Sequence, residues 1–292
     1  MQIFSGLEEI VRSGEPLARH TWLRIGGEAE FFAEPHDPDQ LATLVARCAE
    51  HDIPLRVLGR GSNLLVRDSG APGVVVRPLA EAFSSVLVRE QTVIAGGAAP
   101  LSTLIATSVR EGLGGLENLV GIPGSVGGAL HGNSGAGSVA FAEFVSRVTL
   151  VNAVGEIETR DQEELQFGYR SSGLGDAAVV SVEFELDEDD PAELTRHMQK
   201  LWILKRANQP VSEENICCVF KDPKGGSAAQ VLDQAGLKGM RVGGAEVSDR
   251  HANFIIARDK ATSDDVMRLI DLMRDQALDR VGEELEQQLV VW

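Results

Sequence analysis

The sequence has no surplus of positive charge, since 27 lysines and arginines face 44 aspartates and glutamates, a formal net charge of −17. Nucleic acids and anionic membranes attract proteins through basic surfaces, so we expect neither as a partner. An anionic small-molecule substrate would need a local basic pocket. The candidate side chains for such a pocket are Arg170, Lys205, Arg206, Lys221 and Lys238.

Cysteine and long apolar runs are scarce as well. Cys48 and the adjacent Cys217 and Cys218 cannot form a disulfide framework, and with six scattered histidines they lack the spacing of zinc ligands. No apolar run approaches the roughly 20 residues that span a bilayer, and no basic-then-apolar segment opens the chain. These absences predict a protein of the reducing cytoplasm that holds no metal.

Hydrophobic periodicity predicts alternating helices and strands over the 292 residues. A helix starts after the capping residue Asp37, with Leu41, Leu44, Val45 and Cys48 on its buried face. The other helices are predicted over 101–111, 192–208, 227–234 and 263–281. Strands are predicted over 55–58, 64–66, 74–76, 86–88, 92–95, 147–154, 156–160 and 179–186.

Two segments are read by composition instead of periodicity. The glycine-dense stretch 112–137 is predicted to be loop with room for one short helix. The acidic run 187–191 either separates domains or caps the helix that follows it, and both can hold at once. The sequence thus predicts a strand-rich body of about 190 residues and an α+β domain of about 100.

Two glycine loops are candidates for holding a phosphate group. Residues 58–64 (LGRGSNL) begin like a dinucleotide fingerprint but depart from it at Leu64, and residues 121–128 (GIPGSVGG) lack the Gly-Lys-Ser/Thr ending of a P-loop. Glycine lets a backbone approach a ligand closely, and turn amides can bind anions. Each loop alone is equally compatible with an ordinary turn, whereas together they favour a cofactor pyrophosphate.

These loops belong to an ordered series of motifs. The series comprises 21–27 (TWLRIGG), 58–64, 115–117 (GLE), 121–128, 169–172 (YRSS), 219–223 (VFKDP), 235–239 (AGLKG), 242–248 (VGGAEVS) and 251–254 (HANF). It covers nearly the whole chain and resembles the UDP-N-acetylenolpyruvoylglucosamine reductases of peptidoglycan precursor synthesis. The resemblance is to the shorter form, which lacks a substrate-covering insertion.

The resemblance implies an α+β fold: an FAD-binding domain of the vanillyl-alcohol-oxidase / p-cresol methylhydroxylase type in two subdomains, residues 1–83 and 84–190, and a C-terminal α+β substrate domain, residues 191–292. It implies non-covalent FAD, NADPH as hydride donor, and reduction of the enolpyruvyl ether of a UDP-sugar to UDP-N-acetylmuramate. We expect a monomer.

The resemblance also assigns residues. Arg170 corresponds to the catalytic arginine, which would stabilise the carboxylate and the charge that develops on the substrate. The cofactor-binding residues are Gly59, Arg60, Gly61, Ser62, Asn63, Leu64, Gly121, Ile122, Pro123, Gly124, Ser125, Gly128 and Asn133. The substrate-binding residues are Tyr169, Lys221, Asp222, Lys238 and His251.

Three positions depart from the family pattern. Cys218 replaces the proton-donating serine, and because a thiol is a stronger acid than a hydroxyl, proton transfer remains feasible. Asp222 replaces an asparagine and adds negative charge. Gln288 replaces the catalytic glutamate, and an amide donates hydrogen bonds but cannot act as a proton-transferring acid. Glu286 lies two residues before Gln288, on the same face of the strand and about 6.6 Å along it. Its carboxyl group could substitute for the catalytic glutamate only if the strand were shifted.

Two interpretations follow. The first is a working reductase that uses Arg170 and Cys218 with Gln288 in the altered position. The second is a flavin- or nucleotide-binding protein that kept the fold and lost or weakened its turnover. A third, more distant, is another oxidoreductase of the same flavin superfamily, which the match of the 219–254 motifs disfavours.

Overall fold

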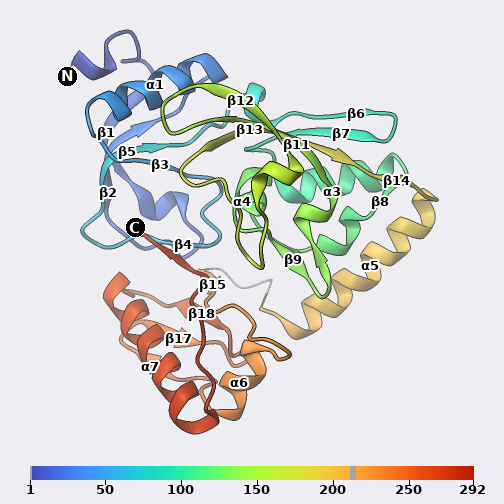
Figure 1. The fold of residues 1–292 in the computed structure, drawn as a ribbon. Coiled ribbons are helices and arrows are strands. Elements are labelled where there is room, and N and C mark those ends of the chain that lie inside the picture. Colours follow the sequence, from blue (N-terminus) through green and yellow to red (C-terminus); the bar gives the residue numbers. More distant parts are fainter. Residues whose placement is uncertain (1, 211–214) are drawn as a thin grey trace. The chain divides into compact units, whose positions relative to one another are not determined.

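The computed structural model describes residues 2–210 and 215–292 and divides the chain into two compact units of interrupted sequence (Figure 1). The first unit comprises Met1–Gly14, Glu30–Arg60 and Pro72–Ile203, and the second Glu15–Ala29, Gly61–Ala71 and Leu204–Trp292. Each unit therefore assembles from segments that are far apart in sequence, and each is described by itself. The division into three domains stays a prediction.

A four-stranded sheet, most of whose residues belong to the first unit, has the order β1-β2-β5-β3. Its strands are β1 (Val11–Pro16), β2 (Glu28–Ala33), β3 (Leu55–Val57) and β5 (Ala71–Val76), with β3 parallel to β5. Helix α1 (Pro38–Glu50) starts as predicted, because the side chain of Asp37 accepts a hydrogen bond from the Gln40 amide at 2.8 Å. Its predicted apolar face is buried, Cys48 included.

A five-stranded antiparallel sheet of order β12-β11-β13-β7-β6 forms the centre of the first unit (Figure 1). Its strands are β6 (Val86–Arg89), β7 (Thr92–Gly96), β11 (Val145–Val151), β12 (Ile157–Asp161) and β13 (Ala178–Glu185). Neighbouring residues of β13 enter different cores, Val179 with α3 (Leu101–Arg110) and α4 (Val126–His131), and Val180 with α1. This is the two-residue period of a strand buried on both faces.

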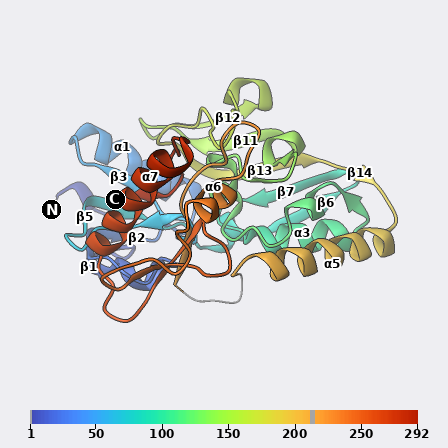
Figure 2. The same ribbon diagram turned by 90° about the horizontal axis from the view of Figure 1, so that it is seen from below.

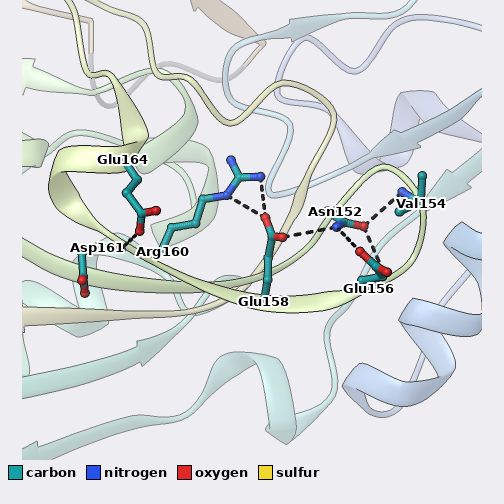
Figure 3. A network of polar contacts seen from close by, with 7 residues as sticks. All are labelled: Asn152, Val154, Glu156, Glu158, Arg160, Asp161 and Glu164. Atoms are coloured by element: carbon teal, nitrogen blue, oxygen red, sulfur yellow. Dashed lines mark hydrogen bonds and ion pairs between the residues drawn. The ribbon is translucent and has the colours of Figure 1, made fainter.

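The turn between β11 and β12 contains Gly155, which separates the strands predicted over 147–154 and 156–160. Asn152 accepts hydrogen bonds from the amides of Val154 and Glu156 and donates to the carboxylates of Glu156 and Glu158, and Arg160 pairs with Glu158 at 2.5 Å (Figure 3). Gly155 has φ +88°, and a Cβ there would lie 2.6 Å from the Ala42 carbonyl oxygen. Only glycine fits this contact with α1.

The glycine-dense stretch contains more structure than predicted. The expected short helix is α4, but the stretch also holds a 3-10 turn at Leu116–Leu119 and the short strands β8 (Leu113–Gly114) and β9 (Gly135–Ala136). Strand β8 pairs with β14 (Asp187–Glu188), and β9 with β10 (Val139–Ala140). Two-residue strands cannot be detected by periodicity because they are too short to repeat the two-residue period of a strand.

The acidic run caps a helix, as one of its two interpretations proposed. The Asp190 carboxylate accepts hydrogen bonds from the amides of Ala192 and Glu193, and α5 (Pro191–Asn208) follows. A carboxylate at this end also suits the helix dipole. The short helix α2 (Glu81–Ser84) was not predicted.

The second unit contains an antiparallel sheet of order β15-β18-β17-β16. Its strands are β15 (Ile216–Cys218), β16 (Arg241–Val242), β17 (Ala245–Val247) and β18 (Phe254–Ala257). Helix α7 (Ser263–Val281) packs on β16 and β17 and contacts α6 (Ala228–Gln234) (Figure 2). The bounds of α7 are as predicted, and its apolar stripe is fully buried: Val266, Leu269, Ile270, Met273 and Ala277.

A parallel pair of two-residue strands, β4 (Leu64–Leu65) and β19 (Val290–Val291), completes the second unit. Leu23 and Leu65 join the core formed by α6, α7 and the sheet. The early segments of the chain are therefore part of this core. Among residues 2–210 and 215–292, no helix is long and apolar enough to cross a membrane.

Candidate functional site

The two glycine loops meet in the first unit. A Cβ on Gly59 would lie 2.6 Å from the hydroxyl oxygen of Ser125, so the first loop presses bare backbone against the second. In the second loop Gly121 and Gly124 have φ of +77° and +125°, which favours glycine. Main-chain hydrogen bonds from Leu101 to Gly124 and from Val126 to Ala99 anchor it on either side of Ser125. The adjacency that a shared cofactor requires is thus present for Gly59 and Ser125.

Ser125 serves the structure of its own loop. It is buried and caps α4, its hydroxyl accepting a hydrogen bond from the Gly128 amide at 3.3 Å. Gly127 packs against Gly97, donating to its carbonyl at 2.8 Å. Ile122, Pro123 and the exposed Gly128 remain at or near the surface. Some of the glycine density therefore comes from backbone packing.

The rest of the first loop lies in the second unit. A Cβ on Gly61 would lie 2.3 Å from the carbonyl oxygen of His20, and the Trp22 amide donates to the Gly61 carbonyl at 2.9 Å. The TWLRIGG motif therefore supports the loop. Ser62 is half-buried and Leu64 is buried in β4, whereas Arg60, in the first unit, and Asn63 are exposed.

Arg170 is held in place by main-chain carbonyls of the first unit. Its guanidinium donates to the carbonyl of Gly135 at 2.9 Å and to that of Asn133 at 3.4 Å, and it lies 5.3 Å from the ring centroid of the exposed Tyr169. Arg170 has φ +53°, an uncommon backbone conformation for a residue other than glycine. These two carbonyls orient a fork of five N–H donors, which leaves donors for a carboxylate.

The side chain of Asn133 links the backbone segments around Arg170. The residue is buried, its Oδ1 accepts from the Ala142 amide at 3.1 Å, and its Nδ2 donates to the Gly168 carbonyl at 2.9 Å. Gly168 directly precedes Tyr169 and Arg170. The family resemblance predicts Asn133 at the cofactor, and this second role has no signal in the sequence because the residues that Asn133 joins are 9 and 35 positions away.

The two adjacent cysteines of the second unit lie in different environments. Cys217 is 2% exposed, and burial raises the pKa of its thiol, whereas Cys218 is partly exposed. They alternate along β15, as expected for a strand. Strand pairing sets Cys218 opposite Phe254 of β18. Cys218 is thus the accessible thiol of the pair.

Asn253 fixes the segment that follows Cys218. Its side chain accepts from the Phe220 amide at 2.9 Å and donates to the Phe220 carbonyl at 2.8 Å, while its main-chain carbonyl accepts from the Val219 amide at 3.0 Å. Both Asn253 and Phe220 are buried. Asn253 was predicted only as part of the HANF motif, although a buried asparagine needs partners for both ends of its side-chain amide.

Residues 286–288 run antiparallel to residues 219–221. The Lys221 amide donates to the Glu286 carbonyl and the Gln288 amide to the Val219 carbonyl, both at 2.8 Å, on either side of a bridge between Phe220 and Gln287. The two segments therefore pair in a regular antiparallel register. Gln288 occupies the position opposite Val219, and Glu286 is held by an ion pair with the ammonium of Lys221 at 2.7 Å.

The other predicted substrate residues lie together in the second unit. The Asp222 carboxylate accepts from the Ala228 amide at 2.8 Å and so caps α6, and Lys238 pairs with Asp233 at 2.9 Å. Burial lowers the pKa of His251. The negative charge of Asp222 opposes this shift, and the positive charge of Lys238 adds to it. The ring of His251 packs edge-on against Phe254, with 5.1 Å between centroids. Asp222, Lys238 and His251 therefore share one electrostatic neighbourhood.

The site residues fall into groups that each unit brings together. Arg170, Tyr169 and Asn133 form one group in the first unit, and Cys218, Lys221, Asp222 and Gln288 with their neighbours form another in the second. Within the part of the chain that the structure describes, no group of three His, Cys, Asp or Glu side chains is placed to hold a metal ion. The guanidinium, ammonium, thiol and amide groups present are of the kinds that can bind an anion or donate a hydrogen bond.

Two family models match the chain. The C-terminal domain of UDP-N-acetylenolpyruvoylglucosamine reductase matches residues 209–292, and an FAD-binding domain matches residues 29–160. The UDP-N-acetylenolpyruvoylglucosamine reductase of Heliobacterium modesticaldum is 44% identical over 280 residues, which are 95% of this chain and 89% of that protein. The enzyme of Rhodopirellula baltica is 38% identical over 98% of this chain and 94% of its own length.

Solved structures agree with the sequence matches. The crystal structure of UDP-N-acetylenolpyruvylglucosamine reductase from Thermus caldophilus superposes with a TM-score of 0.82 at 33% identity, covering 97% of this chain and 98% of that one. The glucose dehydrogenase Phl p 4.0202 shares the fold alone, with a TM-score of 0.50 at 16% identity over 65% of this chain and 45% of its own. The predicted fold class, a flavin domain of the vanillyl-alcohol-oxidase type with a C-terminal α+β domain, is confirmed.

Proposed function

This chain belongs to the family of UDP-N-acetylenolpyruvoylglucosamine reductases, and from that membership we propose that it reduces UDP-N-acetylglucosamine enolpyruvate to UDP-N-acetylmuramate in peptidoglycan precursor synthesis. The observation that carries the proposal is that the likeness covers both the FAD-binding half and residues 209–292. A protein that shared only the flavin domain would match in the first half alone.

The chain's own residues fit a bound FAD. A Cβ on Gly59 would collide with Ser125, so bare backbone forms the place where the two loops meet. Residues 59–64 and 121–128 with Asn133 would hold the cofactor, mostly through main-chain amides. FAD supplies hydride transfer when bound, NADPH is the hydride donor, and the protein supplies orientation and charge.

Arg170 would stabilise negative charge on the substrate. Its guanidinium is oriented by the carbonyls of Gly135 and Asn133, and such preorganised donors act without reorganising during the reaction. A planar guanidinium matches a carboxylate bidentately. The role fits a substrate whose carboxylate gains electron density when hydride adds to the neighbouring double bond.

Cys218 would supply the proton, and Gln288 would donate a hydrogen bond from its amide. Cys218 is the accessible thiol of the adjacent pair. Lys221, Asp222, Lys238 and His251, with Tyr169 in the first unit, would contact the sugar nucleotide. Lys221 already faces the carboxylate of Glu286, so a diphosphate would compete with or join this ion pair.

The substrate class, the cellular location and the oligomeric state complete the proposed function. The substrate is a small UDP-sugar, and we propose that the protein acts in the cytoplasm as a monomer. Neither nucleic acid nor a membrane surface suits a chain with a net charge of −17.

A test begins with the colour of the purified protein. We expect a yellow protein that releases FAD on denaturation and oxidises NADPH far faster when the enolpyruvyl sugar nucleotide is present. A colourless protein that cannot be reconstituted with FAD would overturn the proposal. FAD binding without any stimulation by the sugar nucleotide would favour a binding protein that has lost turnover.

A further inference from the structure

The first cofactor loop is joined to residues 288–292 inside the second unit. The side-chain amide of Asn63 donates to the Gln288 carbonyl at 2.9 Å, and the Val290 amide donates back to the Asn63 carbonyl at 3.2 Å. Two further main-chain bonds follow, from Trp292 to Leu65 at 2.9 Å and from Arg67 to Trp292 at 2.8 Å. The parallel pair β4 and β19 is therefore fastened at its beginning by the Asn63 side chain.

The peptide groups that flank Gln288 connect two parts of the predicted site. On its amide side Gln288 donates to the Val219 carbonyl at 2.8 Å, one residue beyond Cys218. On its carbonyl side it accepts from Asn63. Leu289, which follows, also donates to Val219 at 3.2 Å and is 3% exposed. The position that holds the catalytic glutamate in the family is thus set between the Cys218 strand and the cofactor loop.

Asn63 is exposed, and this makes its contact informative. A buried amide must find partners or lose stability, but an exposed one can be satisfied by water. The exposed Asn63 side chain therefore does not need its hydrogen bond to Gln288 to compensate for the loss of bonds to water. The bond holds the Asn63 side chain against the main chain of residues 288–290. It therefore gives Asn63 a role other than the simple phosphate donor that the loop sequence suggested.

We propose that Asn63 is a positioning residue, which couples FAD binding at residues 59–64 to the placement of Gln288 by residues 288–292. The inference rests on the proposed function, because it takes FAD as the ligand of the loop. Coupling of this kind is reciprocal: if ordered residues 288–292 favour FAD binding, bound FAD orders residues 288–292 to the same extent. Loading the cofactor would then also set the geometry for proton transfer.

The experiment measures FAD affinity and amide exchange separately. Flavin fluorescence titration gives the FAD dissociation constant, and hydrogen exchange of peptides covering residues 286–292 is followed with and without FAD. In the unmodified protein we expect FAD to slow this exchange. Asn63→Ala should raise the dissociation constant about 3- to 10-fold, the effect of one neutral hydrogen bond, and should remove the response of the exchange to FAD.

A second variant approaches the coupling from the other side. Val290→Pro removes the amide that donates to Asn63, at a residue outside the predicted cofactor site, and should weaken FAD binding in the same direction. Ser69→Ala, in the exposed turn after β4, is the matched control and should change neither quantity.

Each outcome decides between defined alternatives. Normal FAD binding with no effect on exchange at residues 286–292 would overturn the coupling and leave the proposed function intact. Weaker FAD binding in Asn63→Ala with an unchanged exchange response, or normal binding in Val290→Pro, would make Asn63 a direct ligand of the cofactor. Failure of the unmodified protein to bind FAD would overturn the proposed function, and the coupling with it.

Discussion

The Arg170 group of the first unit and the Cys218–Gln288 group of the second differ in how they are held. Arg170 is oriented by two main-chain carbonyls, and the buried Asn133 beneath it has both ends of its amide bonded. Around Cys218 the backbone is fixed instead by strand register, through Asn253 and the bonds between 219–221 and 286–288. The first arrangement constrains the identity of Arg170 itself, whereas the second constrains that of Asn253 but only the main-chain position of Cys218 and Gln288.

The three departures from the family pattern that the sequence predicts fall on one side of this difference. All three, Cys218, Asp222 and Gln288, are in the group whose neighbours bond to main-chain atoms. Main-chain bonds survive a change of side chain. Asp222 keeps a capping role that asparagine also performs, since both accept a hydrogen bond from a helix amide. Chemistry can therefore vary in the second unit without loss of geometry.

The largest effect should come from a change in the Arg170 group of the first unit. Arg170→Ala should slow reoxidation of reduced flavin by the sugar nucleotide about 10³-fold while sparing flavin reduction by NADPH, because the charge it stabilises arises only with the sugar nucleotide. Stopped-flow measurement of the two half-reactions checks this. Arg160→Ala is the matched control, since it removes only the ion pair with Glu158 on the β11–β12 hairpin (Figure 3). Equal losses in both half-reactions would make Arg170 structural.

Removing the accessible thiol should have the next largest effect. Cys218→Ala should lower turnover about 10²- to 10³-fold, within the range of about 10²- to 10⁴-fold for a positioned acid, while Cys218→Ser should retain activity. Alkylation offers an independent readout. Burial raises the pKa of Cys48 to about 11 and raises that of Cys217, so near pH 8 both remain protonated and only Cys218 should react.

The substrate should protect Cys218 from the reagent. Cys217→Ala, the adjacent buried position, should keep turnover while losing some stability through a small cavity. Full activity of Cys218→Ala would remove this thiol from the mechanism.

Restoring the family's carboxyl group should produce a gain. Gln288→Glu should raise turnover about 10²-fold, at the low end of the range for a positioned acid, because the new carboxylate adds repulsion to an acidic region. Rates across several pH values should show a new pH-dependent limb. Gln287→Glu is the control, since Gln287 faces the other way and bonds to Arg274 and to the Leu289 carbonyl. A variant that is slower at every pH would show a site rebuilt around the amide.

The smallest effect should follow from restoring asparagine at residue 222. Asp222→Asn keeps the cap of α6, so thermal stability should change little, while loss of one negative charge should lower KM for the sugar nucleotide about fivefold. The same change removes the charge that opposes the lowered pKa of His251, so that pKa should fall further, as a histidine NMR titration would show. An unchanged KM would place the Asp222 carboxylate away from the substrate.

The sequence predicted what depends on neighbours along the chain. The α1 cap at Asp37, the stripe of α7 and the alternation of Cys217 and Cys218 follow from spacings of a few residues. Family resemblance supplied the fold class and the function. These succeed because local hydrogen bonding and the helical period act within one segment.

Contacts between distant segments were not predictable. Asn63 and Gln288 are separated by 225 positions, Lys221 and Glu286 by 65, and neither pair has a periodicity that connects its members. The same holds for Asn133, whose side-chain partners Ala142 and Gly168 lie 9 and 35 positions away. Tertiary pairing decides such roles, so a residue's type alone could indicate that it bonds but not to what.

The interrupted sequence of the second unit has a consequence for how the protein is made. Leu23 and Leu65 belong to the core that α6, α7 and their sheet complete, and that core includes Leu289. During synthesis the segments Glu15–Ala29 and Gly61–Ala71 leave the ribosome long before their partners exist. Their apolar side chains stay exposed to solvent while the intervening segment Pro72–Ile203 is synthesised at a rate of about 5–20 residues per second. This half of the molecule is therefore open to chaperones and proteases until translation has almost finished.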